Sequence, residues 1–169
     1  MSNVTTVPIE IVDKATGHVS IMHFVTEERD GTTGKVRWQR AAPDDAIEAE
    51  LVKSGQALDS VTWRRIDPTD IPVTRDFRNC WRSNGAKIAV DMPLARDEHM
   101  ANIRRARDAM LAKKDGEWVK EFSRGNQAMV DAIEAERQKL RDVPQTIDAG
   151  VRDATTPEAL KAMWPADLD

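Results

Sequence analysis

Alternating apolar and polar residues dominate the first third of the chain. Residues 7–13 and 18–25 alternate with a period of two, and Ala15-Thr16-Gly17 between them is typical of a turn. We therefore predict a β-hairpin here. Residues 35–40 and 61–66 show the same alternation and are predicted as two further strands, the first of them preceded by a polar loop over residues 28–34.

A short helix is predicted between these last two strands. Pro43-Asp44-Asp45 is a typical helix start, and Gly55 a typical stop. The apolar residues expected on one side of this helix are Ala46, Ile47, Leu51 and Val52.

The densest segment of the chain, residues 75–100, contains the strongest turn signal, Asn84-Gly85. A two-residue turn would place Trp81 opposite Ile88. It would also pair Asn79 with Val90 and Phe77 with Met92, which gives one almost wholly apolar side. Arg78, Cys80 and Arg82 are then expected on the other side, with Arg78 opposite Asp91. Core packing explains this pattern without a ligand.

Beyond Pro93 the apolar spacing changes to three and four residues, which predicts helices. The first spans residues 93–114 and the second residues 126–142, and Gly125 is a better turn candidate than Gly116. The apolar positions are Ala95, Ile103, Ala106 and Met110 in the first helix, and Met129, Ile133, Leu140 and Val143 in the second.

A short terminal helix is expected after a loosely patterned stretch that follows Pro144. Thr156 can cap this helix with Pro157 in its first turn, and Pro165 ends it. The expected fold class is α+β, with a β-rich adaptor domain at residues 1–92 and a helical hairpin region at residues 93–169.

Composition indicates a small soluble protein. The 169 residues are 40% hydrophobic and 32% charged, enough for one domain or two small lobes. No apolar run approaches the roughly 20 residues that a membrane helix needs, and the first ten residues lack the pattern of a secretory signal. A single cysteine, Cys80, excludes an internal disulfide and favours a reducing cytoplasm.

Charge argues against a nucleic-acid partner. The net charge is −4, and no aromatic residues interleave with the basic residues of segment 93–114. The following helix is acidic by comparison, so complementary helices or a solvated face explain the basic residues as well.

No catalytic, cofactor or metal site is predicted. The consecutive residues Asp97-Glu98-His99 point about 100° apart on a helix and cannot converge on one ion. Cys80 lacks a recognisable Cys/His signature, and Gly31 to Lys35 lacks the spacing of a phosphate loop. These patterns favour a protein that is not an enzyme.

The aromatic residues are the best candidates for a binding surface. The chain has five tryptophans, three phenylalanines and no tyrosine. Large aromatic side chains organise small cores or anchor interfaces. The candidate partner-binding residues are Trp38, Trp63, Trp118, Phe122 and Trp164. The alternative is that most of them fill a core, and we expect at least three tryptophans to be buried.

A set of short motifs lies in the second half of the chain: Arg78-Asn79-Cys80-Trp81, Gly85, Val90-Asp91-Met92, His99, the helix end Leu140-Arg141-Asp142, and Thr156 to Pro165. Through these motifs, about residues 75–165 resemble the small tail-accessory proteins of tailed bacteriophages, known as tail fibre assembly proteins or tail assembly chaperones. The first 60 residues match nothing in that family, and Gly116 interrupts a helix that is often continuous there.

The resemblance implies a non-enzymatic protein that acts in tail or tail-fibre assembly by binding other proteins. Its partner would be the phage tail fibre or another tail or baseplate protein, met in the cytoplasm of the bacterial host. The alternative is a minor structural subunit that stays in the virion tail, baseplate or fibre-attachment network. Two helices are available for contacts within a homo-oligomer, and neither a membrane nor a cofactor is implied.

Overall fold

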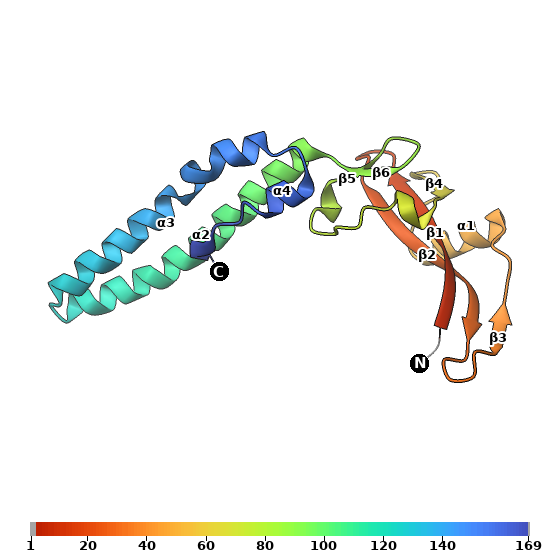
Figure 1. Ribbon diagram of the computed structural model, residues 1–169, viewed down its shortest axis with the longest axis horizontal. Helices are drawn as coiled ribbons and strands as arrows, with labels where there is room; N and C mark the ends of the chain where they lie inside the picture. Colours follow the sequence, from red (N-terminus) through yellow and green to blue (C-terminus); the bar gives the residue numbers. More distant parts are fainter. Residues whose placement is uncertain (1–2, 169) are drawn as a thin grey trace. The chain divides into compact units, whose positions relative to one another are not determined.

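In the computed structural model, which describes residues 3–168, the chain divides into two compact units. The first, the β unit, ends at Asp91, and the second, the helical unit, begins at Met92. A mainly β half is followed by long helices, so the predicted α+β class is confirmed (Figure 1).

A four-stranded antiparallel sheet forms the centre of the β unit, with strand order β3-β2-β1-β4. The predicted hairpin is present, and both of its strands are longer than the alternating segments suggested. The strands are β1 (Asn3–Asp13), β2 (Val19–Arg29), β3 (Val36–Gln39) and β4 (Val61–Arg65).

Helix α1 (Asp44–Lys53) covers one face of this sheet. Ile47 and Leu51 are fully buried, as the helix pattern predicts, but Val52 is 56% exposed. The expectation for Val52 was therefore wrong, because Val52 lies about 100° around the helix from the buried Leu51. The buried residues on this face are Ile9, Ile11, Phe24, Ile47, Leu51 and Val61.

The opposite face is covered by a small hairpin of β5 (Trp81–Ser83) and β6 (Ile88–Val90). Trp81 is 2% exposed and lies in the second core cluster of the β unit. The buried members of this cluster are Val19, Ile66, Trp81 and Ile88. Core packing of Trp81 and Ile88 is thus confirmed.

The predicted register of this hairpin is wrong by two residues, because Trp81 pairs with Val90. The side chain of Asn84 accepts hydrogen bonds from the backbone N–H groups of Ala86 and Lys87, at 3.0 and 2.9 Å. This Asx turn makes a four-residue loop, in which only Gly85 has a positive φ, 83°.

Residues Arg78–Cys80, expected in the strand, form a 3₁₀ turn, so the pairs expected for Phe77, Arg78 and Asn79 do not form. Cys80 was expected on the outer side with the arginines. It is instead 3% exposed and buried.

A buried ion pair links the sheet to the hairpin loop. Glu10 is 1% exposed, pairs in register with Arg64 and forms an ion pair with its guanidinium group. The same guanidinium group donates two hydrogen bonds of 3.1 Å to the carbonyl of Ala86. The other carboxylate oxygen of Glu10 has no hydrogen-bond partner among the described residues.

The helical unit is an antiparallel hairpin of two long helices, α2 (Met92–Ser123) and α3 (Gln127–Asp153) (Figure 1). Gly125 has a φ of 72°, and the N–H of Asn126 bonds to the carbonyl of Glu121 at 3.1 Å. This is a glycine-dependent helix end. The turn at Gly125 is confirmed. The predicted end of the first helix at residue 114 is wrong, because α2 continues through Gly116 to Ser123.

The predicted end of the second helix near residue 142 is wrong, because α3 continues through Pro144 to Asp153. The same observation removes Leu140-Arg141-Asp142 as a helix end. An internal proline costs a helix about 3 kcal/mol. Both Val143 and Pro144 are buried, so packing offsets that cost here.

A short helix, α4 (Pro157–Lys161), and the turn η3 (Ala166–Leu168) both contact α2. The hydroxyl of Thr156 accepts a hydrogen bond from the N–H of Ala159 at 3.1 Å, which confirms the predicted cap. The helix ends at Lys161, before Pro165.

Candidate protein-binding surfaces

Two stacked aromatic rings lie on α2 near the hairpin turn. Trp118 and Phe122 are four residues apart, and their rings are nearly parallel, with centroids 4.9 Å apart. Phe122 is 59% exposed and the neighbouring Val119 is 60% exposed. Residues three and four apart share one side of a helix. These three residues are called the aromatic patch below.

Charged contacts with α3 hold Trp118 in place. The guanidinium group of Arg137 lies 5.8 Å from the centre of the Trp118 ring, within range of a cation–π interaction. Arg137 also forms ion pairs with Asp115, at 2.6 Å, and with Glu134. Glu134 in turn accepts from Arg141 at 2.7 Å, and this hydrogen bond is the main cause that lowers the pKa of Glu134.

This arrangement orders the aromatic patch before any partner binds. Side chains that are already fixed lose less conformational entropy on association. A stacked, partly exposed aromatic pair also gives a large contact area in a small space.

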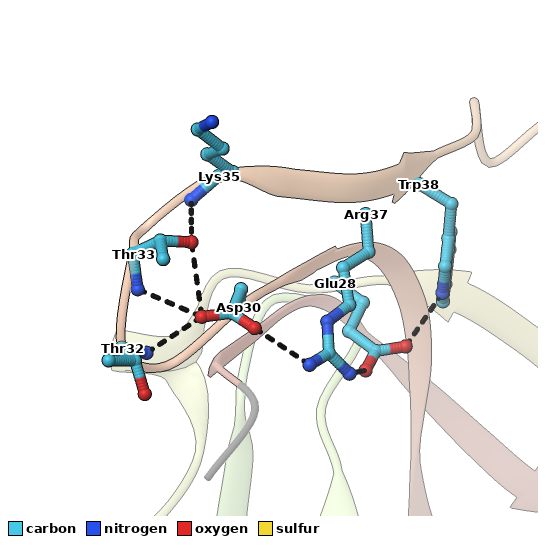
Figure 2. Close-up of polar contacts among 7 residues, drawn as sticks. All are labelled: Glu28, Asp30, Thr32, Thr33, Lys35, Arg37 and Trp38. Carbon is cyan, nitrogen blue, oxygen red and sulfur yellow. Dashed lines mark hydrogen bonds and ion pairs between the residues drawn. The ribbon is translucent and has the colours of Figure 1, made fainter.

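Trp38 lies on β3, the edge strand of the sheet, and is 39% exposed. Its indole Nε1 donates to Glu28 at 2.8 Å, as Figure 2 shows. Arg37 bridges Glu28 and Asp30, at 3.3 and 2.8 Å. The hydrogen bond from Arg37 is the main cause that lowers the pKa of Asp30 to about 2, and the N–H groups of Thr33 and Thr32 add to it.

These contacts give β3 a defined surface, but a poor docking edge. The strand is only four residues long, its pairing with β2 is irregular, and it carries the charged side chain of Arg37. Edge strands with such features resist pairing with other chains.

The side chains of Trp63 and Trp164 are only partly accessible to a binding partner. Trp63 is half-buried and packs against the core cluster on the α1 side of the sheet. Trp164 is 37% exposed, and its ring meets that of His99 edge-on, with centroids 6.0 Å apart. Each aromatic therefore contributes in part to packing.

The five predicted residues do not form one surface. Trp118 and Phe122 touch each other, whereas Trp164 contacts His99, 19 residues before Trp118 on α2 and hence about 28 Å away along the helix. The expectation of at least three buried tryptophans was wrong: among the described residues, only Trp81 is buried.

A second surface, which the sequence prediction missed, is a groove between α2 and α3. Its lining includes Met110 and Lys114 from α2, and Met129, Glu136 and Leu140 from α3. The signal was present in the sequence as regular helical spacing. That spacing predicted helices only, because a pattern alone cannot show whether a helix face contacts its own chain or another.

His99 is buried at 5% exposure, and burial lowers the pKa of its imidazole. Across residues 3–168, no three or more His, Cys, Asp or Glu side chains are placed to hold a metal ion. Within the same range, no helix has both the length and the apolar character needed to cross a membrane.

Comparisons with protein-family models, with curated proteins and with solved structures find no match to this chain.

Proposed function

We propose that this chain acts in bacteriophage tail or tail-fibre assembly by binding another protein, as a chaperone-like factor and not as an enzyme. Its partner is a tail fibre or another tail or baseplate protein, bound in the host cytoplasm during assembly. The sequence resemblance over about residues 75–165 supports this role. The observation that carries the binding mode is the stacked pair Trp118–Phe122, in which Trp118 is half-buried and Phe122 is 59% exposed.

An aromatic patch of this kind suits a binding role. Interface hot spots are enriched in tryptophan and lie among contacts that exclude water. Here Arg137 supports Trp118 from α3, while Val119 and Phe122 extend the apolar area outward. A partner that covers the patch removes apolar surface from water without reordering the helix.

Co-purification with the fibre and tail proteins encoded beside this chain tests the proposal. We expect wild-type protein to retain one of them, and Phe122→Ser to weaken that complex by about 1 to 2 kcal/mol, roughly five- to thirtyfold. Trp118→Ala is a second variant, and an unchanged melting temperature separates lost binding from lost folding.

Val73→Ser is the matched control, since Val73 is fully exposed in the β unit. Its complex should be as tight as that of the wild type. Full retention of the partner by both patch variants would contradict the proposed binding mode.

The second candidate function is a structural subunit that stays in the finished tail. It is favoured by the length of α2 and α3, 32 and 27 residues, which offers a long surface for permanent contacts. The number of copies in purified particles separates the two roles: a chaperone is absent, whereas a subunit is present in a fixed ratio to the other tail proteins.

A further inference from the structure

The loop between β5 and β6 contains a chemically reactive pair of residues. Asn84 is followed by Gly85, and both are exposed. Glycine has no side chain, so it leaves the backbone nitrogen after the asparagine open to close approach. None of the other four asparagines precedes a glycine; they are Asn3, Asn79, Asn102 and Asn126.

The loop polarises the side-chain carbonyl of Asn84. Its Oδ1 accepts hydrogen bonds from the backbone N–H groups of Ala86, at 3.0 Å, and Lys87, at 2.9 Å. Two N–H donors on one carbonyl oxygen form the arrangement of an oxyanion hole, which stabilises the negative charge that develops on the oxygen when its carbon is attacked. The fold therefore makes Cγ of Asn84 more electrophilic.

The backbone nitrogen of Gly85 has an acceptor for its proton. Its N–H donates to the hydroxyl oxygen of Ser83 at 3.2 Å. Ser83 is only half-buried, so its hydroxyl can pass a proton on to solvent. The nitrogen and Cγ of Asn84 belong to adjacent residues and close a five-membered ring, so their encounter costs little entropy.

We propose that Asn84 is a self-modification site, at which this loop promotes conversion of the asparagine to aspartate or isoaspartate. The Gly85 nitrogen loses its proton through Ser83 to solvent and forms a bond to Cγ of Asn84. The bond from Cγ to the side-chain nitrogen breaks, and that nitrogen takes up a proton from solvent and leaves as ammonia.

Solvent water then opens the cyclic imide. Cleavage of the bond between Cγ and the Gly85 nitrogen gives aspartate, whereas cleavage of the bond between the Asn84 backbone carbonyl carbon and the same nitrogen gives isoaspartate. This chemistry goes beyond the proposed protein-binding function, because it involves neither the aromatic patch nor the helical unit.

Two Asp-Gly pairs have the atoms for the same ring closure, but their surroundings oppose it. Asp30 precedes Gly31, and the hydrogen bond from Arg37 is the main cause that lowers the pKa of Asp30 to about 2. Asp30 is therefore ionised at neutral pH, and a carboxylate is a poor electrophile. Asp115 precedes Gly116 within α2, where helical hydrogen bonding occupies the backbone N–H groups.

The two products affect the β unit differently. Aspartate keeps an oxygen that accepts from Ala86 and Lys87. Isoaspartate adds one carbon to the backbone and so displaces the loop, whose Ala86 carbonyl accepts two hydrogen bonds of 3.1 Å from Arg64. Because Arg64 is also the ion-pair partner of the buried Glu10, isoaspartate loosens the contact between hairpin and sheet.

Mass spectrometry of proteolytic peptides tests the proposal on the purified full chain, incubated at mildly alkaline pH and digested at mildly acidic pH. We expect Asn84 to exchange its amide for a carboxylate at least about tenfold faster than Asn126, which is also exposed but precedes Gln127. Isoaspartyl methyltransferase labels isoaspartate and not aspartate, so it identifies the product.

Two variants test the roles of the neighbouring residues. Gly85→Ala should slow the reaction at least about tenfold, because it places a methyl group beside the attacking nitrogen. Ser83→Ala, which does not change the backbone at Gly85, should slow it at least about threefold by removing the proton acceptor. Ser60→Ala is the matched control, since it removes an exposed hydroxyl from another loop of the β unit and should leave the rate unchanged.

The same chain unfolded in guanidinium chloride shows whether the folded loop promotes the reaction. Unfolding removes the two N–H donors and the Ser83 contact but leaves the Asn-Gly pair, so the folded chain should react at least about threefold faster. Four results would overturn the proposal: no mass change at Asn84, equal rates at Asn84 and Asn126, a wild-type rate in Ser83→Ala, or a rate in the unfolded chain that equals or exceeds that of the folded chain.

Discussion

The two ends of the helical hairpin are built differently. In the proximal hairpin, formed by Met92–Ile103 with α4, Ala95, Ile103 and Leu160 are fully buried. In the distal hairpin, formed by the rest of α2 and α3 up to Leu140, the buried residues all come from α3. The proximal hairpin therefore has buried residues on both of its elements, whereas the distal hairpin has them on α3 alone.

Ion pairs take the place of packing in the distal hairpin. Lys114 bridges Glu117 and Glu136, and Arg137 bridges Asp115 and Glu134 across the two helices. Exposed ion pairs contribute little to stability. This difference supports the proposed function, in which the distal hairpin binds the partner while the packed proximal hairpin maintains the fold.

The largest expected loss of stability follows from a substitution in the core of the proximal hairpin. Ile103→Ala should lower the free energy of unfolding of the helical unit by about 2 to 5 kcal/mol, because it opens a cavity at a fully buried site. Urea unfolding followed by helix circular dichroism at 222 nm measures the loss.

Val119→Ala is the distal control, and it should change the unfolding free energy by no more than about 0.5 kcal/mol. Comparable losses for Ile103→Ala and Val119→Ala would contradict the division into a packed and an open end.

A smaller effect, of opposite sign, is expected at Gly116. This residue is exposed within α2, and a methyl group added there would meet nothing within 4 Å. Gly116→Ala should therefore stabilise the distal hairpin by about 0.5 to 1 kcal/mol, since alanine loses less conformational entropy in a helix. Amide hydrogen exchange across α2 measures the local gain.

The turn provides the comparison for that substitution. Gly125 has a φ of 72°, which an L side chain rarely adopts. Gly125→Ala should destabilise the hairpin, although the same methyl group is added. Protection that rises equally in both variants would show that space, and not backbone conformation, decides the outcome.

Much of the β unit could be predicted from the sequence, because strict alternation identifies strands and their buried faces. The register of the second hairpin could not, since it depends on whether the Asn84 side chain bonds to the loop backbone. That choice between a two- and a four-residue loop is made by local hydrogen bonds.

For the helices, a different feature could not be predicted from the sequence. The stripe Met129, Ile133, Leu140 was correctly predicted as helical, yet its spacing is the same for a core and for a groove. The end of α3 was missed because Pro144 normally ends a helix, and only its burial in the folded chain explains the exception. Trp118 and Phe122 were among the candidate binding residues, but the sequence could not show that their two rings stack.

The smallest expected effects concern the pH dependence of stability, which differs between the two ends of the hairpin. Burial lowers the pKa of His99 in the proximal hairpin from its ordinary value of 6.5. A lowered pKa favours the neutral imidazole in the folded state. Its contribution is therefore fully present above about pH 6.5, and it is lost as the pH falls through the folded pKa.

In the distal hairpin, the groups with shifted pKa values are two carboxylates and a lysine. The pKa values of Glu117 and Glu134 lie below the ordinary 4.5, mainly because they accept hydrogen bonds from Lys114 and Arg141. Their contribution is present above about pH 4.5 and is lost on further acidification. Lys114, whose pKa is raised to about 12, keeps its contribution until the pH rises well above 10.5.

Side-chain NMR titration measures the pH ranges in which these groups titrate. Lys114→Gln should shift the midpoint of Glu117 upward, because it removes the donor that lowers the pKa of this carboxylate, while leaving the midpoint of His99 unchanged. If Lys114→Gln moved both midpoints, the two ends of the hairpin would be coupled through α2. The distal hairpin could not then open or bind without disturbing the proximal core, and the separation of stability from binding would be wrong.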